Sequence, residues 1–146
     1  MGEAGEGWAR ARLKLDRIHH LGLIVSDLEH SLDSYARLLG SELEVRRRME
    51  EEGMEAALVR IGGERVELIQ PLGEGPLKRF LDRRGDGVHH VAWVVDDLDQ
   101  ALGQAAELGQ EVVPPGIRLG LGGERVAFLH PRGMGGVLTE LVEERP

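Results

Sequence analysis

The 146-residue chain contains no cysteine, and its aromatic residues amount to two Trp, one Tyr and two Phe. Without cysteine it cannot form a disulfide scaffold, a zinc–thiolate centre or an iron–sulfur cluster, and it has no cysteine nucleophile. Long hydrophobic runs are also missing, since no apolar segment approaches the roughly 20 residues that a membrane-spanning helix needs. We therefore expect no membrane partner, and any metal site must use His, Asp or Glu ligands.

Positive charge is scarce as well. The chain has 18 Lys and Arg residues against 26 Asp and Glu residues, which gives a formal net charge of −8. This acidic, aromatic-poor composition lacks both the cationic surface and the stacking platforms of a nucleic-acid-binding protein. Residues 1–14 have no apolar core typical of a signal peptide. We expect a cytoplasmic protein in which a loose tail over 1–14 precedes a single domain over 15–146.

The most informative feature present is an internal repeat. The segments IHHLGLIVSDLEHSL (18–32) and VHHVAWVVDDLDQAL (88–102) match at a fixed offset, so that His20 corresponds to His90. Each segment begins as an apolar strand with a His pair. After an acidic N-cap position, each continues into an amphipathic helix, over about 27–39 in the first half and 97–108 in the second.

Strand-like stretches follow each helix. They cover 42–46, 54–61 and 65–70 in the first half, and 111–113, 125–129 and 137–142 in the second. Each half is therefore a βαβββ module, module one over about 15–73 and module two over about 85–144, joined by a short helix at 76–82. Because neither module has enough layers to close a core alone, we predict an α+β fold in which two tandem βαβββ modules form one cupped mixed sheet.

Side chains alternate across a strand, so the strand register decides which residues share a face. His20 shares its face with Gly22, and His90 shares its face with Ala92, whereas the opposite faces carry bulkier residues suited to packing under the helices. A small residue two positions after the histidine leaves room on that face. This pattern selects His20 and His90, rather than the histidine that precedes each of them, as candidate functional residues.

Two glutamates lie inside otherwise apolar strands, Glu67 in RVELIQP and Glu140 in VLTELVE. A buried carboxylate is costly unless it is paired or binds a cation. Together with His20 and His90 they would bring two imidazoles and two carboxylates to the junction of the modules, and a divalent cation would make that set electrically neutral. Such ligands suit Co, Mn, Ni, Fe or Zn. The alternative is a purely structural set, with hydrogen-bonded core histidines and with glutamates paired to neighbouring arginines such as Arg65.

Three stretches carry a family resemblance: RIHHLGLIVSDLEHSLDSYARLLG, PLGEGPLKRFLDRRGDGVHHVAWVVDDLD and GGERVAFLHPRGMGGVLTEL. They resemble the vicinal oxygen chelate (glyoxalase/bleomycin resistance/dioxygenase) superfamily and, within it, the methylmalonyl-CoA epimerase family, over roughly 17–143. The resemblance implies one divalent metal ion, with cobalt favoured over manganese, nickel and zinc. The implied ligands are His20, Glu67, His90 and Glu140, the second of which is glutamine in some relatives. It also implies an acyl-CoA substrate and a homodimer.

The implied reaction is inversion at C2 of methylmalonyl-CoA, by removal and return of a proton through a metal-stabilised enolate. Inversion needs an acid/base group on each face of the enolate, or one mobile group. Glu140 is one candidate. Glu55 is the candidate for the opposite face if a bulge intervenes, because an ungapped match places Ala56 where some relatives carry a glutamate. The arginines of 46–48 and 83–84 are candidate partners for the coenzyme A phosphates.

Two other functions compete with this one. A glyoxalase-like lactoylglutathione lyase would use the same metal on a glutathione hemithioacetal, and the HPRGMGGVL segment argues against it. A metal-free small-molecule-binding module of the antibiotic-resistance type would usually lack the full His/Glu set that this chain has.

Overall fold

The computed structural model describes residues 12–145, so most of the predicted tail lies outside the described residues. None of the described helices is both long and apolar enough to span a bilayer. In chain order the elements are β1 (Leu15–Ile24), α2 (Leu28–Leu39), β2 (Glu42–Met49), η1 (Glu50–Glu52), β3 (Met54–Ile61), β4 (Glu64–Pro71), α3 (Pro76–Arg84), β5 (Gly87–Val95), α4 (Leu98–Glu107), β6 (Arg118–Leu119), β7 (Arg125–Leu129), η2 (Pro131–Gly133) and β8 (Leu138–Glu143).

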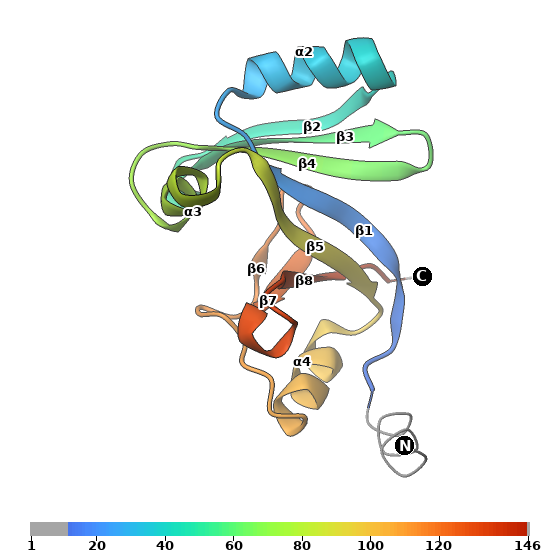
Figure 1. The fold of residues 1–146 in the computed structure, drawn as a ribbon. Helices are drawn as coiled ribbons and strands as arrows, with labels where there is room; N and C mark the ends of the chain where they lie inside the picture. The colour runs from blue at the N-terminus through green and yellow to red at the C-terminus, as the bar shows by residue number, and fades with distance from the viewer. Residues whose placement is uncertain (1–11, 146) are drawn as a thin grey trace.

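The strands form one mixed sheet in the order β2-β3-β4-β1-β5-β8-β7-β6. β1 is parallel to β4 and β5 is parallel to β8, whereas the remaining neighbours, including β1 and β5 at the centre, are antiparallel. The order of one half therefore repeats in the other, and two βαβββ modules meet at β1 and β5. The sheet curls into a cup, with α2 outside one half and α4 outside the other (Figure 1). The predicted α+β fold is confirmed.

Each of these two helices covers the outer face of its own half of the sheet. The carboxylates of Asp27 and Asp97 accept a hydrogen bond from the backbone N–H three residues later, at 3.0 Å in both cases, and so cap α2 and α4 as the sequence predicts. The outer cores consist of Val25, Leu28, Ala57 and Leu68 under α2, and of Val95, Leu98, Ala101, Ala105, Ala127, Leu129 and Leu141 under α4. These cores fix the strands whose inner face forms the site.

The structure differs from the sequence prediction at one edge of the sheet. The stretch 111–113 is not a strand, since only Val112 makes an isolated bridge, and the edge strand is instead β6 at Arg118–Leu119. Pro114 and Pro115 lie between the two, and neither has the backbone N–H that a strand ladder requires. The chain therefore leaves the sheet after the bridge and rejoins it at β6, where the first residue of the strand lines the cup.

Candidate metal centre

Cross-strand pairing explains why a glycine, Gly22, lies two positions after His20. Gly22 of β1 lies opposite His90 of β5 in the antiparallel pair and beside Glu67 of β4 in the parallel pair. A Cβ atom on Gly22 would lie 2.0 Å from His90 Cε1, far inside van der Waals contact. The space left by the missing side chain is therefore occupied by the imidazole of the other module.

Ala92 has the equivalent place in module two. It lies opposite His20 in the same antiparallel pair and beside Glu140 in the parallel pair of β5 with β8. The two small residues thus mark the points where an imidazole from one strand and a carboxylate from another meet across the centre of the sheet. This arrangement follows directly from the internal repeat.

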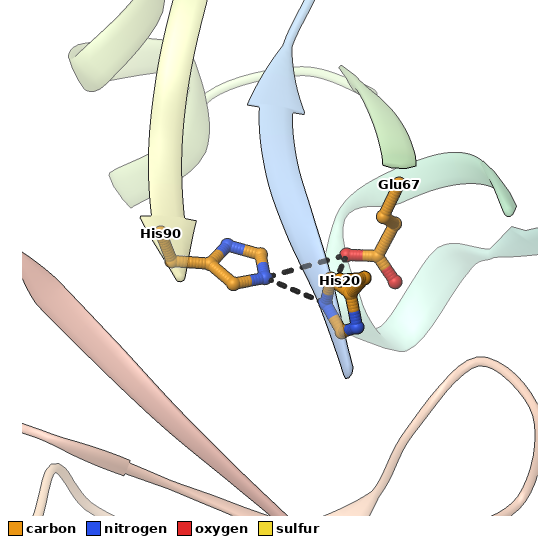
Figure 2. A group of neighbouring side chains, drawn as sticks. All are labelled: His20, Glu67 and His90. Carbon is orange, nitrogen blue, oxygen red and sulfur yellow. Dashed lines mark hydrogen bonds and ion pairs between the residues drawn. The ribbon is translucent and has the colours of Figure 1, made fainter. Parts of the chain in front are cut away.

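The four side chains converge from the adjacent strands β4, β1, β5 and β8, and Figure 2 shows three of them pointing toward one another. The Nε2 atoms of His20 and His90 are 3.0 Å apart. Glu140 Oε1 lies 3.0 Å from His20 Nε2 and 3.3 Å from His90 Nε2. Glu67 Oε1 lies 3.8 Å and 3.7 Å from the same two nitrogens. All four side chains are buried.

The histidine that precedes each member of the pair holds its ring in place. His19 Nδ1 lies 2.8 Å from His20 Nδ1, and His89 Nδ1 lies 2.9 Å from His90 Nδ1. Burial lowers the pKa of His19, and it lowers the pKa of His89 to about 4, so both rings are neutral at neutral pH. A neutral ring that accepts the Nδ1–H of its neighbour leaves the neighbour's Nε2 lone pair free. Sequence reasoning missed this role, although the repeated His–His pair was a signal for it.

The pKa values within the cluster shift in opposite directions. Burial raises the pKa of Glu67. Burial also opposes ionisation of Glu140, but its close contacts with the two imidazoles outweigh burial and lower the pKa of Glu140 to about 2. For His20, burial lowers the pKa, but the nearby carboxylates outweigh it and the net shift is upward. In the absence of a cation, the cluster therefore takes up protons to limit its buried negative charge.

The donor set fits a divalent cation. Glu140 Oε1 is buried and has no hydrogen-bond partner among the described residues, which is costly for an isolated carboxylate oxygen. Adjacent donors around an ion bonded at about 2.1 Å are about 3.0 to 3.4 Å apart. The distances from Glu140 Oε1 to the two Nε2 atoms lie in this range. His20, Glu67 and His90 also present ligand atoms that all lie within 4.8 Å of one another.

The neighbouring arginines do not neutralise the two buried glutamates. Arg65 pairs with Glu44 at 3.3 Å. Arg125, on β7 beside Glu140's strand, pairs with Asp99 at 3.1 Å and with Glu143 at 3.2 Å. The structural alternative, in which arginines balance the carboxylates of the cluster, is therefore not what the structure shows.

A cavity of about 320 Å³ opens beside the cluster. His90, Glu67 and Glu140 form part of its wall. Much of the remaining wall is apolar and comes from both modules, including Met49, Met54, Ile69, Leu77, Phe128 and Leu138. A cavity of this size and lining suits a small organic group held against a few polar side chains.

Glu55 does not lie in this site, which corrects the expectation for it. The pairing of β3 with β4 runs residue by residue from Met54 to Ile61 without a bulge. Because a strand alternates its faces, Met54 lines the cavity and Glu55 points to the opposite side of the sheet. There the Glu55 carboxylate pairs with Arg46 at 2.9 Å. The bulge needed to turn Glu55 inward is absent from these two strands.

A family model and a curated relative match this chain. The model of the Glyoxalase/Bleomycin resistance protein/Dioxygenase superfamily matches residues 19–128. The ethylmalonyl-CoA/methylmalonyl-CoA epimerase of Cereibacter sphaeroides is 32% identical over 130 residues, which cover 87% of this chain and 97% of the relative. The family match includes His20, Glu67 and His90, in the strands described above.

Solved structures are similar over almost the whole chain. The crystal structure of methylmalonyl-CoA epimerase from Mycobacterium tuberculosis has a TM-score of 0.85 and 33% identity, and the match covers 94% of this chain and 96% of that one. A methylmalonyl-CoA epimerase in complex with methylmalonyl-CoA and NH4+ has a TM-score of 0.85 and 33% identity, covering 91% of this chain and 100% of the other.

Proposed function

Because this chain belongs to the glyoxalase/bleomycin resistance protein/dioxygenase superfamily and is an epimerase of the methylmalonyl-CoA epimerase family, we propose that it interconverts the C2 epimers of methylmalonyl-CoA with one divalent metal ion. The observation that carries the proposal is the buried cluster of His20, Glu67, His90 and Glu140 at the wall of a cavity. We propose these four residues as the metal ligands.

The protein side chains have separate tasks in this proposal. When bound, the ion supplies electrostatic stabilisation for the negative charge that develops next to C2 as the proton leaves. His20 and His90 would hold the ion through Nε2, and the preceding histidines fix the orientation of both rings. The two glutamates balance the charge of the ion, and the apolar cavity wall limits the access of water to the reacting carbon.

Glu140 is the acid/base group of the proposed reaction. In the ion-free cluster the two imidazoles lower the pKa of Glu140, so its carboxylate is ionised at neutral pH. Oε1 faces the two imidazoles, which leaves Oε2 to accept the C2 proton as the C–H bond breaks. Since Glu55 lies outside the cavity, it is not the group that returns the proton to the opposite face of the enolate. The exchange removes and restores one proton and needs no redox partner.

The proposal is tested by turnover of two substrates. Protein stripped of metal and reconstituted with Co²⁺ should epimerise methylmalonyl-CoA and should leave the glutathione hemithioacetal of methylglyoxal unchanged. Turnover of the hemithioacetal alone would instead identify a lactoylglutathione lyase. Failure to bind a stoichiometric divalent ion after reconstitution, with neither substrate converted, would favour the metal-free binding module.

Metal affinity is expected to fall in acid. The pKa of His20 and the pKa of Glu67 are both raised in the ion-free protein, so both groups carry protons at higher pH than usual and must release them to bind metal. Below the raised pKa of His20, the association constant for Co²⁺ should fall about tenfold per pH unit for each proton displaced. Isothermal titration calorimetry in buffers of different ionisation enthalpy measures both the association constant and the number of protons released. If the Co²⁺ affinity did not change between about pH 8 and about pH 5.5, and no protons were released on binding, the four-residue site would be contradicted.

The Glu55→Gln variant is expected to keep its catalytic activity. The side chain lies on the outer face and pairs with Arg46 at 2.9 Å and with Arg48 at 3.8 Å, so its neutralisation removes two surface ion pairs, each worth about 0 to 1 kcal/mol of folding stability. The turnover number of the Co²⁺-loaded variant should stay within about twofold of the wild type, because surface ion pairs contribute little. A turnover number about a hundredfold or more below that of the wild type would show that Glu55 takes part in the reaction.

Three further features remain proposals: cobalt as the preferred ion and a homodimer, which the family resemblance implies, and a cytoplasmic location, which the sequence composition predicts. Metal analysis of protein purified from its native cells tests the first. Light scattering of the purified protein over a range of concentrations tests the second, and fractionation of the native cells tests the third.

A further inference from the structure

The cavity contains a cationic side chain to which the proposed reaction assigns no task. Arg118 is the one arginine or lysine among the described residues that line the cavity. It is the first residue of the short edge strand β6, where it pairs with Val126 of β7. Its side chain is 26% exposed. The guanidinium is therefore held largely inside the protein, in the same cavity as the metal cluster.

The hydrogen-bonding capacity of Arg118 is only partly used. Its Nε atom is buried and has no hydrogen-bond partner among the described residues. Nη2 donates to the carbonyl oxygen of Pro114 at 3.2 Å, and Nη1 lies 3.5 Å from Glu52 Oε2. A guanidinium offers five N–H groups in a planar fork that matches a carboxylate. A buried N–H without a partner is costly, and an anionic ligand in the cavity would satisfy it.

Aromatic packing fixes Arg118 relative to the metal cluster. The Arg118 guanidinium lies over the Phe128 ring, with Cζ 5.3 Å from the ring centroid. The Phe128 ring in turn makes an edge contact with the His90 ring, with centroids 5.5 Å apart. A single aromatic ring thus separates the cation from a proposed metal ligand, and this stack pre-organises the guanidinium for binding.

Arg118 is the second cationic group that the cavity would offer to a ligand. A bound divalent ion would balance the charges of Glu67 and Glu140, so the remaining charged pair on the cavity wall is Glu52 with Arg118. The Glu52 side chain is 37% exposed, and its long contact with Arg118 is of the kind that contributes little to stability. An entering anion can therefore displace Glu52 into solvent at small cost.

We propose that Arg118 recognises the free carboxylate of the substrate, and that this carboxylate takes the place of Glu52 on the guanidinium. The inference rests on the proposed function and deepens it, because it makes Arg118 the residue that selects malonyl-type thioesters over acyl-CoA esters that lack the second carboxylate. The phosphates of coenzyme A carry the same anionic chemistry, so the test must separate the two groups.

The test compares the affinities of two CoA esters for Co²⁺-reconstituted protein by isothermal titration calorimetry. Methylmalonyl-CoA carries the carboxylate, whereas propionyl-CoA has the same phosphates without it. Arg118→Met should raise the dissociation constant of methylmalonyl-CoA about 10- to 100-fold, the cost of a lost hydrogen bond to a charged group, and should change that of propionyl-CoA by less than about twofold. Arg37→Met, on the exposed surface of α2, is the matched control and should change neither.

A second variant keeps the test decisive if Arg118→Met does not fold. Glu52→Gln removes the competing carboxylate, so it should lower the dissociation constant of methylmalonyl-CoA about two- to fivefold and leave that of propionyl-CoA unchanged. Equal weakening of both esters by Arg118→Met would assign the arginine to the coenzyme phosphates and overturn the inference, as would unchanged affinities in both variants. In either case, epimerisation by the wild type would leave the proposed function standing. A wild type that neither binds nor epimerises methylmalonyl-CoA would overturn both.

Discussion

Replacing Glu140 with Gln is expected to lower the turnover number by about 10³-fold, whereas Glu67→Gln should stay within about tenfold of the wild type. Each substitution removes one negative charge from the same buried cluster and keeps an oxygen that can bind a cation. Only Glu140 has the second task of accepting the C2 proton, which an amide cannot perform. Comparison of the two variants therefore separates the effect of proton transfer from the effect of charge balance.

The measurement is the turnover number of each variant with its bound metal determined in the same sample. If Glu140→Gln binds Co²⁺ stoichiometrically and is inactive, the acid/base role stands apart from the ligand role. Equal loss of activity in both variants at full metal occupancy would show that charge, rather than a proton acceptor, is what the cluster supplies. Full activity of Glu140→Gln would remove Glu140 from the reaction.

Gly22→Ala is expected to damage the site without changing any proposed ligand. The new Cβ atom would lie 2.0 Å from His90 Cε1. The His90 ring is 2% exposed and is enclosed by the rings of His20, His89 and Phe128, so it cannot move aside and still keep Nε2 in the cluster. We expect Co²⁺ affinity to fall about 100-fold and the free energy of unfolding of the ion-free protein to fall by about 1 to 3 kcal/mol.

Gly103→Ala is the matched control for this variant. Gly103 lies within α4, and a Cβ atom there would meet nothing within 4 Å. Alanine in a helix should stabilise the protein by about 0.5 to 1 kcal/mol and leave metal binding unchanged. Calorimetric titration with Co²⁺ and urea denaturation measure both effects. Wild-type metal affinity in Gly22→Ala would show that the close approach of the two modules is not required.

The internal repeat and the strand register were enough to predict the fold and to select the four clustered residues. The reason is that a period of two fixes the inner face of each strand. The structure adds the cross-strand pairs of Gly22 with His90 and of Ala92 with His20. The sequence prediction interpreted the two small residues only as empty space. The antiparallel register, which no sequence pattern stated, shows that an imidazole from the other module lies there.

The features that sequence reasoning missed depend on contacts between distant segments. Glu55 was a candidate only if a bulge were present, and bulges have no reliable sequence signature beyond an interrupted alternation. Arg118 lies after a break of two prolines and could not be assigned to the cavity until β6 was placed on the sheet edge. The roles of His19 and His89 needed side-chain geometry, because adjacent strand residues nominally point to opposite faces.

The central claim is that this cluster exchanges the C2 proton of methylmalonyl-CoA only when it holds a divalent ion. Incubation of the substrate in D₂O with metal-free and with Co²⁺-loaded wild-type protein, followed by mass spectrometry, tests this claim directly. The account predicts incorporation of one deuterium at C2 of both epimers with the loaded protein, and none above the uncatalysed background with the stripped protein. Exchange at the full rate after complete removal of metal would contradict it.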